Sequence, residues 1–330
     1  DRPTLSMVFR TEVTPTGFLT SANATAEQGM ELSYLTGGLT WKADYVAELS
    51  NKEDSIDLNG WVTLTNTSGT AYNNARLQLI AGEVNRAQPE SRPMPRMAKA
   101  MAMADAAPQM QEEGLFEYHL YTLDRLTTLL DNQTKQVALL SAQKVQVDKE
   151  YRLTGGDWYY AGQFGDLGKK MKPGVYMEFL NKSEKSEKGE NTGLGVPLPK
   201  GIVRVYKKDS AGRAQFVGED RIDHTAKGET IRLKLGEAFD ITADKKQTDF
   251  QKLTGFNTRG GMIETAYQME IRNAKSEKVV VTVVEPISGE WQMLQESHPH
   301  KKESAHNAIW SIPVPAEGKA TLTWRVRVKY

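Results

Sequence analysis

The sequence has no cysteine, no surplus of basic residues and no long hydrophobic run, and each absence excludes a class of protein. Without cysteine, the 330-residue chain can form no disulfide, no thiol nucleophile and no thiolate metal site. There are 42 basic residues (lysine and arginine) and 42 acidic residues (aspartate and glutamate). This balance disfavours binding to nucleic acid and electrostatic attraction to a membrane surface. No run of about 18 apolar residues could form a transmembrane helix.

Catalytic and cofactor-binding motifs are also missing. The sequence contains no G-x-S-x-G nucleophile motif, no G-x-x-x-x-G-K-[ST] phosphate loop and no G-x-G-x-x-G dinucleotide motif. A glycosidase needs two carboxylates at a fixed separation in space, and 42 acidic residues leave that pair unselected. We therefore predict no catalytic residue, no metal and no cofactor from the sequence.

What the sequence does contain is apolar and polar residues in alternation, which is typical of strands with one buried face. Leu58, Val62 and Leu64 share one face of the segment 57–65, and Trp61 falls on the other. The segment 322–330 alternates most clearly, with Leu322, Trp324, Val326, Val328 and Tyr330 on one side, and Thr323, Arg325, Arg327 and Lys329 on the other. Strands with one polar face favour antiparallel sheets.

Short strands separated by turn residues are typical of a sandwich or a barrel, and no long amphipathic helix interrupts them. The length fits two domains. We expect an all-β protein of two antiparallel β-sandwich-like domains, residues 1–168 and residues 169–330, the second immunoglobulin-like.

Two stretches interrupt the strand pattern. Residues 87–114 contain four prolines and five methionines with few β-branched residues, so we predict a flexible insertion or a marginal helix between strands. Residues 181–191 are polar and charged, which indicates a solvated loop.

Histidines and methionines are the candidate metal ligands. His298, His300 and His306 lie close together, but lysines 301 and 302 beside them oppose a cation, so we favour a solvated hairpin loop. Met94, Met97 and Met101 have helical spacing, which fits a soft metal such as Cu(I) less well than a packing stripe or an unstructured segment.

One aromatic cluster is a candidate binding site. Trp158, Tyr159, Tyr160 and Phe164 lie within a glycine-rich segment, GGDWYYAGQFGDLG. Aromatic side chains on a loop can stack on a sugar or a peptide. The alternative is that Trp158 and Tyr160 fill the end of a sandwich, and the large share of aromatic residues in protein cores favours it.

Several segments resemble a known bacterial family. They are residues 32–49 (LSYLTGGLTWKADYVAEL), 57–69, 77–86, 117–123 (EYHLYTL), 216–224 (FVGEDRIDH), 235–240 and the terminal TWRVRVKY. Together they resemble the domain-of-unknown-function family numbered 4139, to which mucoidy-inhibitor-like proteins belong. The family has no agreed activity, so the resemblance assigns no residue a role. It implies an exported or envelope-associated β protein.

The chain begins at Asp1 rather than at a methionine, and a removed signal peptide is one explanation. We expect an exported bacterial protein, periplasmic or on the cell surface, with a non-catalytic structural or binding role. Its expected partner is an envelope protein or glycan. The alternative is a hydrolase that acts on envelope polysaccharide through carboxylates not yet recognised. The binding role requires a flat face with an aromatic patch, whereas the hydrolase requires a deep cleft that holds two acidic groups.

Overall fold

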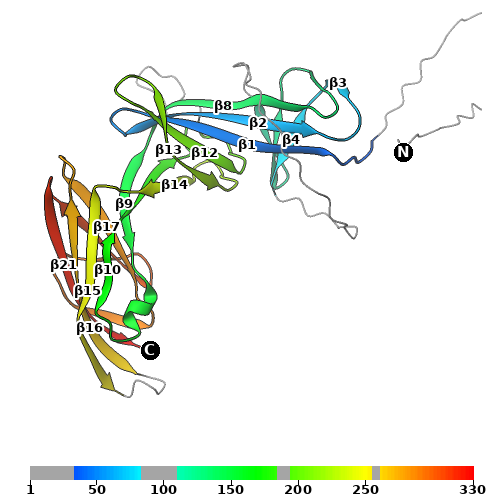
Figure 1. Cartoon of the computed structure of the whole chain (residues 1–330). Helices are drawn as coiled ribbons and strands as arrows, with labels where there is room; N and C mark the ends of the chain where they lie inside the picture. Colours follow the sequence, from blue (N-terminus) through cyan, green and yellow to red (C-terminus); the bar gives the residue numbers. More distant parts are fainter. Residues whose placement is uncertain (1–32, 83–109, 184–193, 255–260) are drawn as a thin grey trace, which may run out of the picture. The chain divides into compact units, whose positions relative to one another are not determined.

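The computed structural model describes residues 33–82, 110–183, 194–254 and 261–330. These residues form twenty-one strands, β1 to β21, and a single short 3₁₀ helix, η1 (Asp157–Tyr160) (Figure 1). Residues 38–330 make up one compact unit. The predicted all-β fold with sandwich-like sheets is confirmed.

Three large sheets supply the layers of the fold. The first has the order β13 (Ala214–Ile222), β12 (Gly201–Lys208), β1 (Leu39–Leu49), β2 (Ser55–Asn66), β8 (Thr134–Gln146). The second has the order β10 (Asp166–Met171), β15 (Ile241–Thr254), β16 (Met262–Asn273), β21 (Gly318–Lys329), β18 (Glu290–Glu296). The third has the order β14 (Thr230–Glu237), β11 (Gly174–Leu180), β9 (Asp148–Thr154), β17 (Val279–Pro286), β20 (Asn307–Val314), β19 (Lys301–Lys302).

Two small sheets complete the described strands. One pairs β3 (Tyr72–Ala75) with β7 (Thr127–Leu129). The other places β6 (Tyr118–Thr122) between β4 (Gln78–Ala81) and β5 (Gln111–Leu115).

Within the described residues, the buried side chains form two hydrophobic cores. The first core joins residues of β1, β2, β8 and β12 to residues of β11 and β14, among them Tyr45, Val205 and Leu233. The second core lies between the second sheet and strands β9, β17 and β20, and it contains Trp310 and Trp324. Both cores draw residues from either side of the expected boundary between residues 168 and 169, and that division stays a prediction.

The alternation in the sequence correctly identifies the buried face of individual strands. In β2, Leu58, Val62 and Leu64 are buried. In β21, Leu322, Trp324, Val326 and Val328 are buried, whereas the arginines between them are only partly exposed. Antiparallel pairing dominates, but β1 pairs with β12 and β9 pairs with β17 in parallel. These parallel pairs join strands far apart in sequence, which the local pattern does not specify.

The predicted insertion at residues 87–114 falls largely outside the described residues. Its end does not: Met110 is buried in the first core, and Gln111–Gly114 belong to β5, paired with β6. The prediction of an insertion is therefore wrong for these last residues, because β5 gains its stability from pairing with β6 rather than from its own composition. Of the predicted loop at residues 181–191, only the first three residues are described.

Three buried asparagines close turns. Asn66, Asn181 and Asn273 are at most 2% exposed. The amide nitrogen of Asn66 donates to the carbonyls of Thr70, Leu129 and Leu130, while its oxygen accepts from Ser68 N. The amides of Asn181 and Asn273 likewise bridge backbone groups of separate segments. Each asparagine side chain supplies hydrogen bonds to backbone groups of the turn, which would otherwise be buried without a partner.

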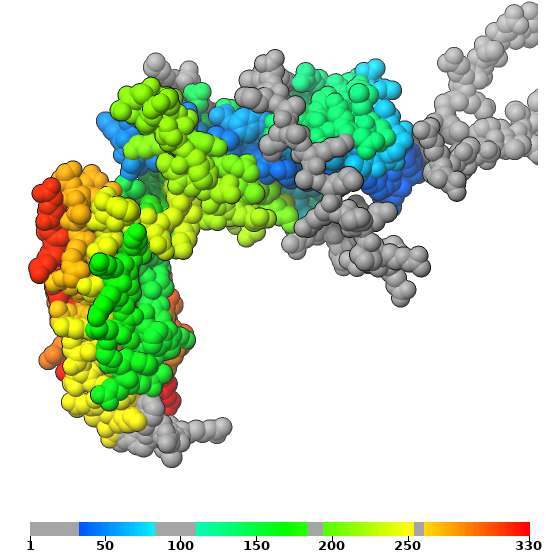
Figure 2. All heavy atoms as spheres, in the orientation of Figure 1, coloured from blue at the N-terminus to red at the C-terminus, as the bar shows by residue number. Residues whose placement is uncertain are grey.

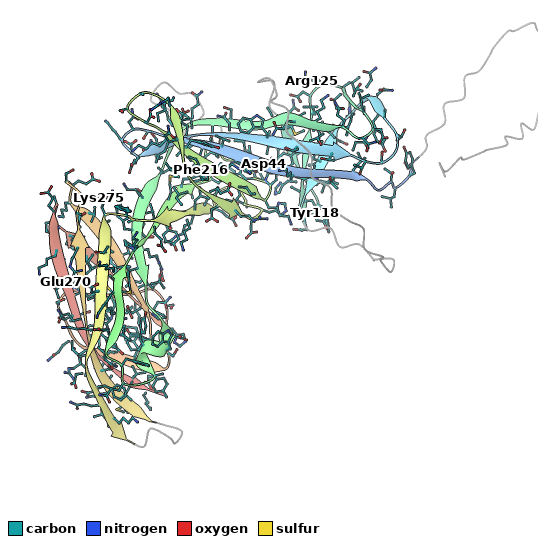
Figure 3. The ribbon with its side chains drawn as sticks, in the orientation of Figure 1. Asp44, Tyr118, Arg125, Phe216, Glu270 and Lys275 are labelled. Carbon is teal, nitrogen blue, oxygen red and sulfur yellow. The ribbon has the colours of Figure 1, made fainter. Side chains whose placement is uncertain are left out.

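The outer face of the second sheet carries a row of charged side chains. Glu270, labelled in Figure 3, pairs with Arg272 on its own strand at 2.7 Å and with Lys319 of β21 at 3.1 Å. Arg272 also pairs with Asp244 of β15 at 2.7 Å. Strands β10 and β15 run side by side on the face shown in Figure 2, in green and yellow. This solvated face opposes the apolar face that covers the second core.

Candidate functional site

The structure separates the four aromatic residues predicted as a binding cluster. Tyr159 and Tyr160, in helix η1, are 9% and 0% exposed and belong to the second core. Trp158 is 52% exposed and Phe164 is 37% exposed. Within η1, the tight 3₁₀ turn directs Trp158 to solvent and Tyr159 and Tyr160 to the core, and Phe164 follows in the loop after the helix. Trp158 and Phe164 remain available to a partner, and we call them the aromatic pair.

The aromatic pair is a fixed edge-to-face arrangement. The two rings lie 5.2 Å apart at 82°. Gln247 of β15 fixes the backbone next to Phe164. Its side-chain oxygen accepts a hydrogen bond from Phe164 N at 2.5 Å, and its side-chain nitrogen donates to Gly162 O at 3.0 Å. Because Gln247 is itself buried, the short loop at residues 162–164 is anchored to the sheet. A partner would meet rings that need little further ordering.

Directly beneath η1 lies a buried ion pair. Lys245 of β15 and Glu285 of β17 have side chains that are 1% and 0% exposed, and Lys245 Nζ lies 2.6 Å from Glu285 Oε2. The Tyr160 hydroxyl donates to the same oxygen at 2.8 Å. Glu285 Oε1 has no hydrogen-bond partner among the described residues. Two opposite charges thus occupy the interior with an incomplete set of hydrogen bonds.

Aromatic rings surround the lysine of this pair. Lys245 Nζ lies 3.9 Å from the ring centre of Tyr159 and 5.1 Å from those of Tyr267 and Trp324. Burial lowers the pKa of Lys245 below its ordinary value, although the charge and hydrogen bond of Glu285 act in the opposite direction. Burial, together with the charge of Glu285, raises the pKa of Tyr160 well above its ordinary value. Tyr160 therefore stays a hydrogen-bond donor.

Lys245 and Glu285 belong to no recognisable motif, although the sequence carries a signal for both. Ile241, Ala243 and Lys245 occupy one face of β15 by alternation, and Val281, Val283 and Glu285 occupy one face of β17. A lysine in one inward row and a glutamate in another predict two buried charges. Because buried charges are almost always paired, the two strands could have been predicted to face each other with the lysine in contact with the glutamate.

The three histidines do not converge. His298 Nδ1 lies 2.9 Å from Ser297 Oγ, and His300 Nδ1 lies 2.9 Å from Glu296 Oε2. His306 is exposed. Among the described residues, no group of three or more histidine, cysteine, aspartate or glutamate side chains could hold a metal ion. Met94, Met97 and Met101 lie outside the described residues.

Two grooves on the surface of the described residues bear on the hypotheses of a hydrolase or a binding protein. One, of about 380 Å³, is lined by strands β1, β12 and β13 and contains the carboxylates Asp44 and Asp223. Asp44, labelled in Figure 3, lies 3.3 Å from Arg204 Nη1 through one oxygen and 2.9 Å from Lys42 Nζ through the other. Its charge is therefore already matched. The other groove, of about 470 Å³, is mostly apolar and includes Trp41, Leu64 and Leu129.

Comparison with known proteins gives a family but no function. No curated protein matches the sequence, and no solved structure matches the fold. In the described part of the chain, no helix is both long and apolar enough to cross a membrane. Residues 30–330 match the family described as a domain of unknown function (DUF4139), and the chain belongs to that family.

Proposed function

We propose that this protein is an exported component of a bacterial cell envelope with a non-catalytic structural or binding role, and that it binds an envelope glycan or protein through the aromatic pair. The observation that supports the proposal is the exposed Trp158 ring, held edge-to-face against Phe164 on an anchored loop. A flat, exposed indole is the surface on which the apolar face of a sugar ring stacks. We call the second sheet, together with the strands of the third sheet that cover the second core, the second sandwich, and we further propose that it is immunoglobulin-like and presents this loop at one end.

A binding titration tests the role of the aromatic pair. The full chain is titrated with soluble fragments of the producing organism's cell-wall glycan, and Trp158→Ala is compared with the parent protein. Loss of one stacking contact worth about 1–1.5 kcal/mol weakens binding about tenfold. Phe239→Ala is the matched control, because Phe239 is 82% exposed and belongs to neither ring of the pair.

The outcomes separate the two classes of partner. Weaker glycan binding by Trp158→Ala and unchanged binding by Phe239→Ala support a glycan. If the parent protein binds no glycan but captures a defined envelope protein in a Trp158-dependent way, the partner is a protein. Trp158-independent binding to both would refute the proposed surface. Fractionation of the producing cells tests the location, and recovery of the protein from the cytosol alone would contradict export.

The alternative of a polysaccharide hydrolase depends on a different place. Asp44 and Asp223 line the same groove, but a glycosidase needs one protonated and one free carboxyl group about 5–10 Å apart. The ion pairs of Asp44 with Arg204 and Lys42 favour a structural role. New reducing ends that appear during the glycan titration and vanish in Asp223→Asn would favour the hydrolase.

A further inference from the structure

The ion pair of Lys245 and Glu285 joins the two layers of the second sandwich. Lys245 lies on β15 of the second sheet, and Glu285 lies on β17 of the third sheet, forty positions further along the chain. Their side chains meet inside the core rather than at its rim, since both are at most 1% exposed. Any bond between them would close a forty-residue loop across the sandwich.

The pair is costly in its charged form. Moving two opposite charges out of water is compensated only when their remaining hydrogen-bonding groups are satisfied. Here Tyr160 donates to Glu285 Oε2, but Glu285 Oε1 has no partner among the described residues. The backbone of Gly155 lies so close to the carboxylate that an added Cβ would be 2.5 Å from Oε2, which leaves little room for water on that side. A neutral product would remove this cost.

The geometry also favours a reaction between the two groups. Nζ is in contact with the carboxyl group at 2.6 Å from Oε2, and the core fixes both side chains. Groups held this way react as if present at effective concentrations of about 10⁵–10⁸ M. Burial lowers the pKa of Lys245, so the neutral amine, which is the nucleophile, is more accessible than on a surface lysine.

We propose that Lys245 and Glu285 condense to an intramolecular isopeptide bond. A proton first passes from the Lys245 ammonium to Glu285 Oε2, which leaves a neutral amine and a neutral acid. The nitrogen lone pair forms a bond to Cδ, and the bond between Cδ and Oε2 breaks. Oε2 departs as water with a second proton from the nitrogen, relayed by the Tyr160 hydroxyl, which already contacts Oε2. No oxidant or reductant takes part.

The competing arrangement is a permanent ion pair, which the ring of Tyr159 at 3.9 Å from Nζ stabilises. The two arrangements differ in mass by one water molecule. They also differ in connectivity, because only the isopeptide links the peptides that contain Lys245 and Glu285 after proteolysis. Intact-mass and peptide mass spectrometry of the full chain therefore distinguish them directly.

The experiment uses the purified full chain after incubation in the folded state. We expect an intact mass lower than the sequence mass by one water, and a cross-linked peptide pair containing residues 245 and 285. The double variant Lys245→Met with Glu285→Leu replaces the pair by apolar groups of similar volume, which buried pairs tolerate. It is expected to fold and to show its full sequence mass.

A matched control removes an exposed lysine and an exposed glutamate, one on β15 and one on β18, both strands of the second sheet. Lys246→Met with Glu290→Leu changes two exposed positions outside the ion pair and is expected to keep the loss of one water. A parent protein that retains its full sequence mass, with no linked peptide after prolonged incubation, overturns the proposal. Loss of water that persists in the Lys245→Met and Glu285→Leu variant would also overturn it, because the dehydration would then lie elsewhere.

Discussion

Replacing Trp324 should destabilise the second sandwich far more than replacing Arg327, although the two residues are only three positions apart on β21. Trp324 is 2% exposed, stacks on Tyr267 at 5.1 Å and 24°, and lies 5.3 Å from the ring of Trp310. Truncation of such a ring to alanine removes its contacts and leaves a cavity. The expected loss is about 3–5 kcal/mol.

Arg327 lies on the opposite face of the strand. Its side chain is 42% exposed and pairs with Glu264 of β16, to which Arg327 Nε donates at 2.9 Å. Ion pairs with this much solvent contribute about 0–1 kcal/mol, and glutamine keeps much of the side-chain stem. Arg327→Gln should therefore cost less than about 1 kcal/mol.

Urea denaturation followed by far-ultraviolet circular dichroism measures both variants with one probe. With a slope of about 2 kcal/mol per molar urea, Trp324→Ala should lower the midpoint by about 1.5–2.5 M. Arg327→Gln should move it by less than about 0.5 M with an unchanged slope. Equal midpoints, or a larger shift for Arg327→Gln, would refute the assignment of the buried face or show that the Arg327–Glu264 pair is a central part of the sandwich.

Two further predictions concern Gly155 and Glu53. Gly155→Ala should lower thermal stability by about 1–3 kcal/mol, because the added Cβ would lie 2.5 Å from Glu285 Oε2. Gly165→Ala is the control and should have little effect, because no atom lies within 4 Å of the position of its Cβ. Equal melting temperatures of the two variants would contradict the close approach of Gly155 to Glu285. Burial raises the pKa of Glu53, but hydrogen bonds from Lys149 and Lys207 outweigh burial and bring the pKa from 4.5 to about 2. Since the folded pKa is depressed, the carboxylate stabilises the fold above about pH 4.5, and this contribution is lost as pH falls through about 2. Acid titration should therefore cost the parent protein on the order of 1 kcal/mol more stability than Glu53→Gln, and identical acid profiles would exclude this role.

Strand faces were predictable because they depend on residues two positions apart. The rows Leu58–Val62–Leu64 and Leu322–Trp324–Val326–Val328 are buried as alternation predicts. The partner of each strand depends on residues far away in sequence, so the parallel pairing of β1 with β12 could not be derived from the pattern. Strand β5 could not be predicted either, because it has little strand propensity of its own and depends on pairing with β6.

The candidate site was predictable only in part. The glycine-rich aromatic segment was singled out, but the division between exposed Trp158 and buried Tyr160 depends on the 3₁₀ turn of η1. Lys245 and Glu285 meet across two sheets, and no local pattern reports contact between strands of different sheets. The sequence does place Lys245 and Glu285 each in an inward-facing row of its strand, and this position predicts that both charges are buried.

The buried asparagines have a consequence for producing this protein in other hosts. Asn66 and Asn181 begin Asn-x-Ser sequences, which eukaryotic secretory cells glycosylate. Both amides are engaged and inaccessible in the folded protein, so a sugar could attach only before folding. A glycan on either amide would then block the turn that the asparagine closes. Secretion from a yeast or mammalian cell should yield misfolded protein, whereas the exposed Asn132 would accept a glycan without harm.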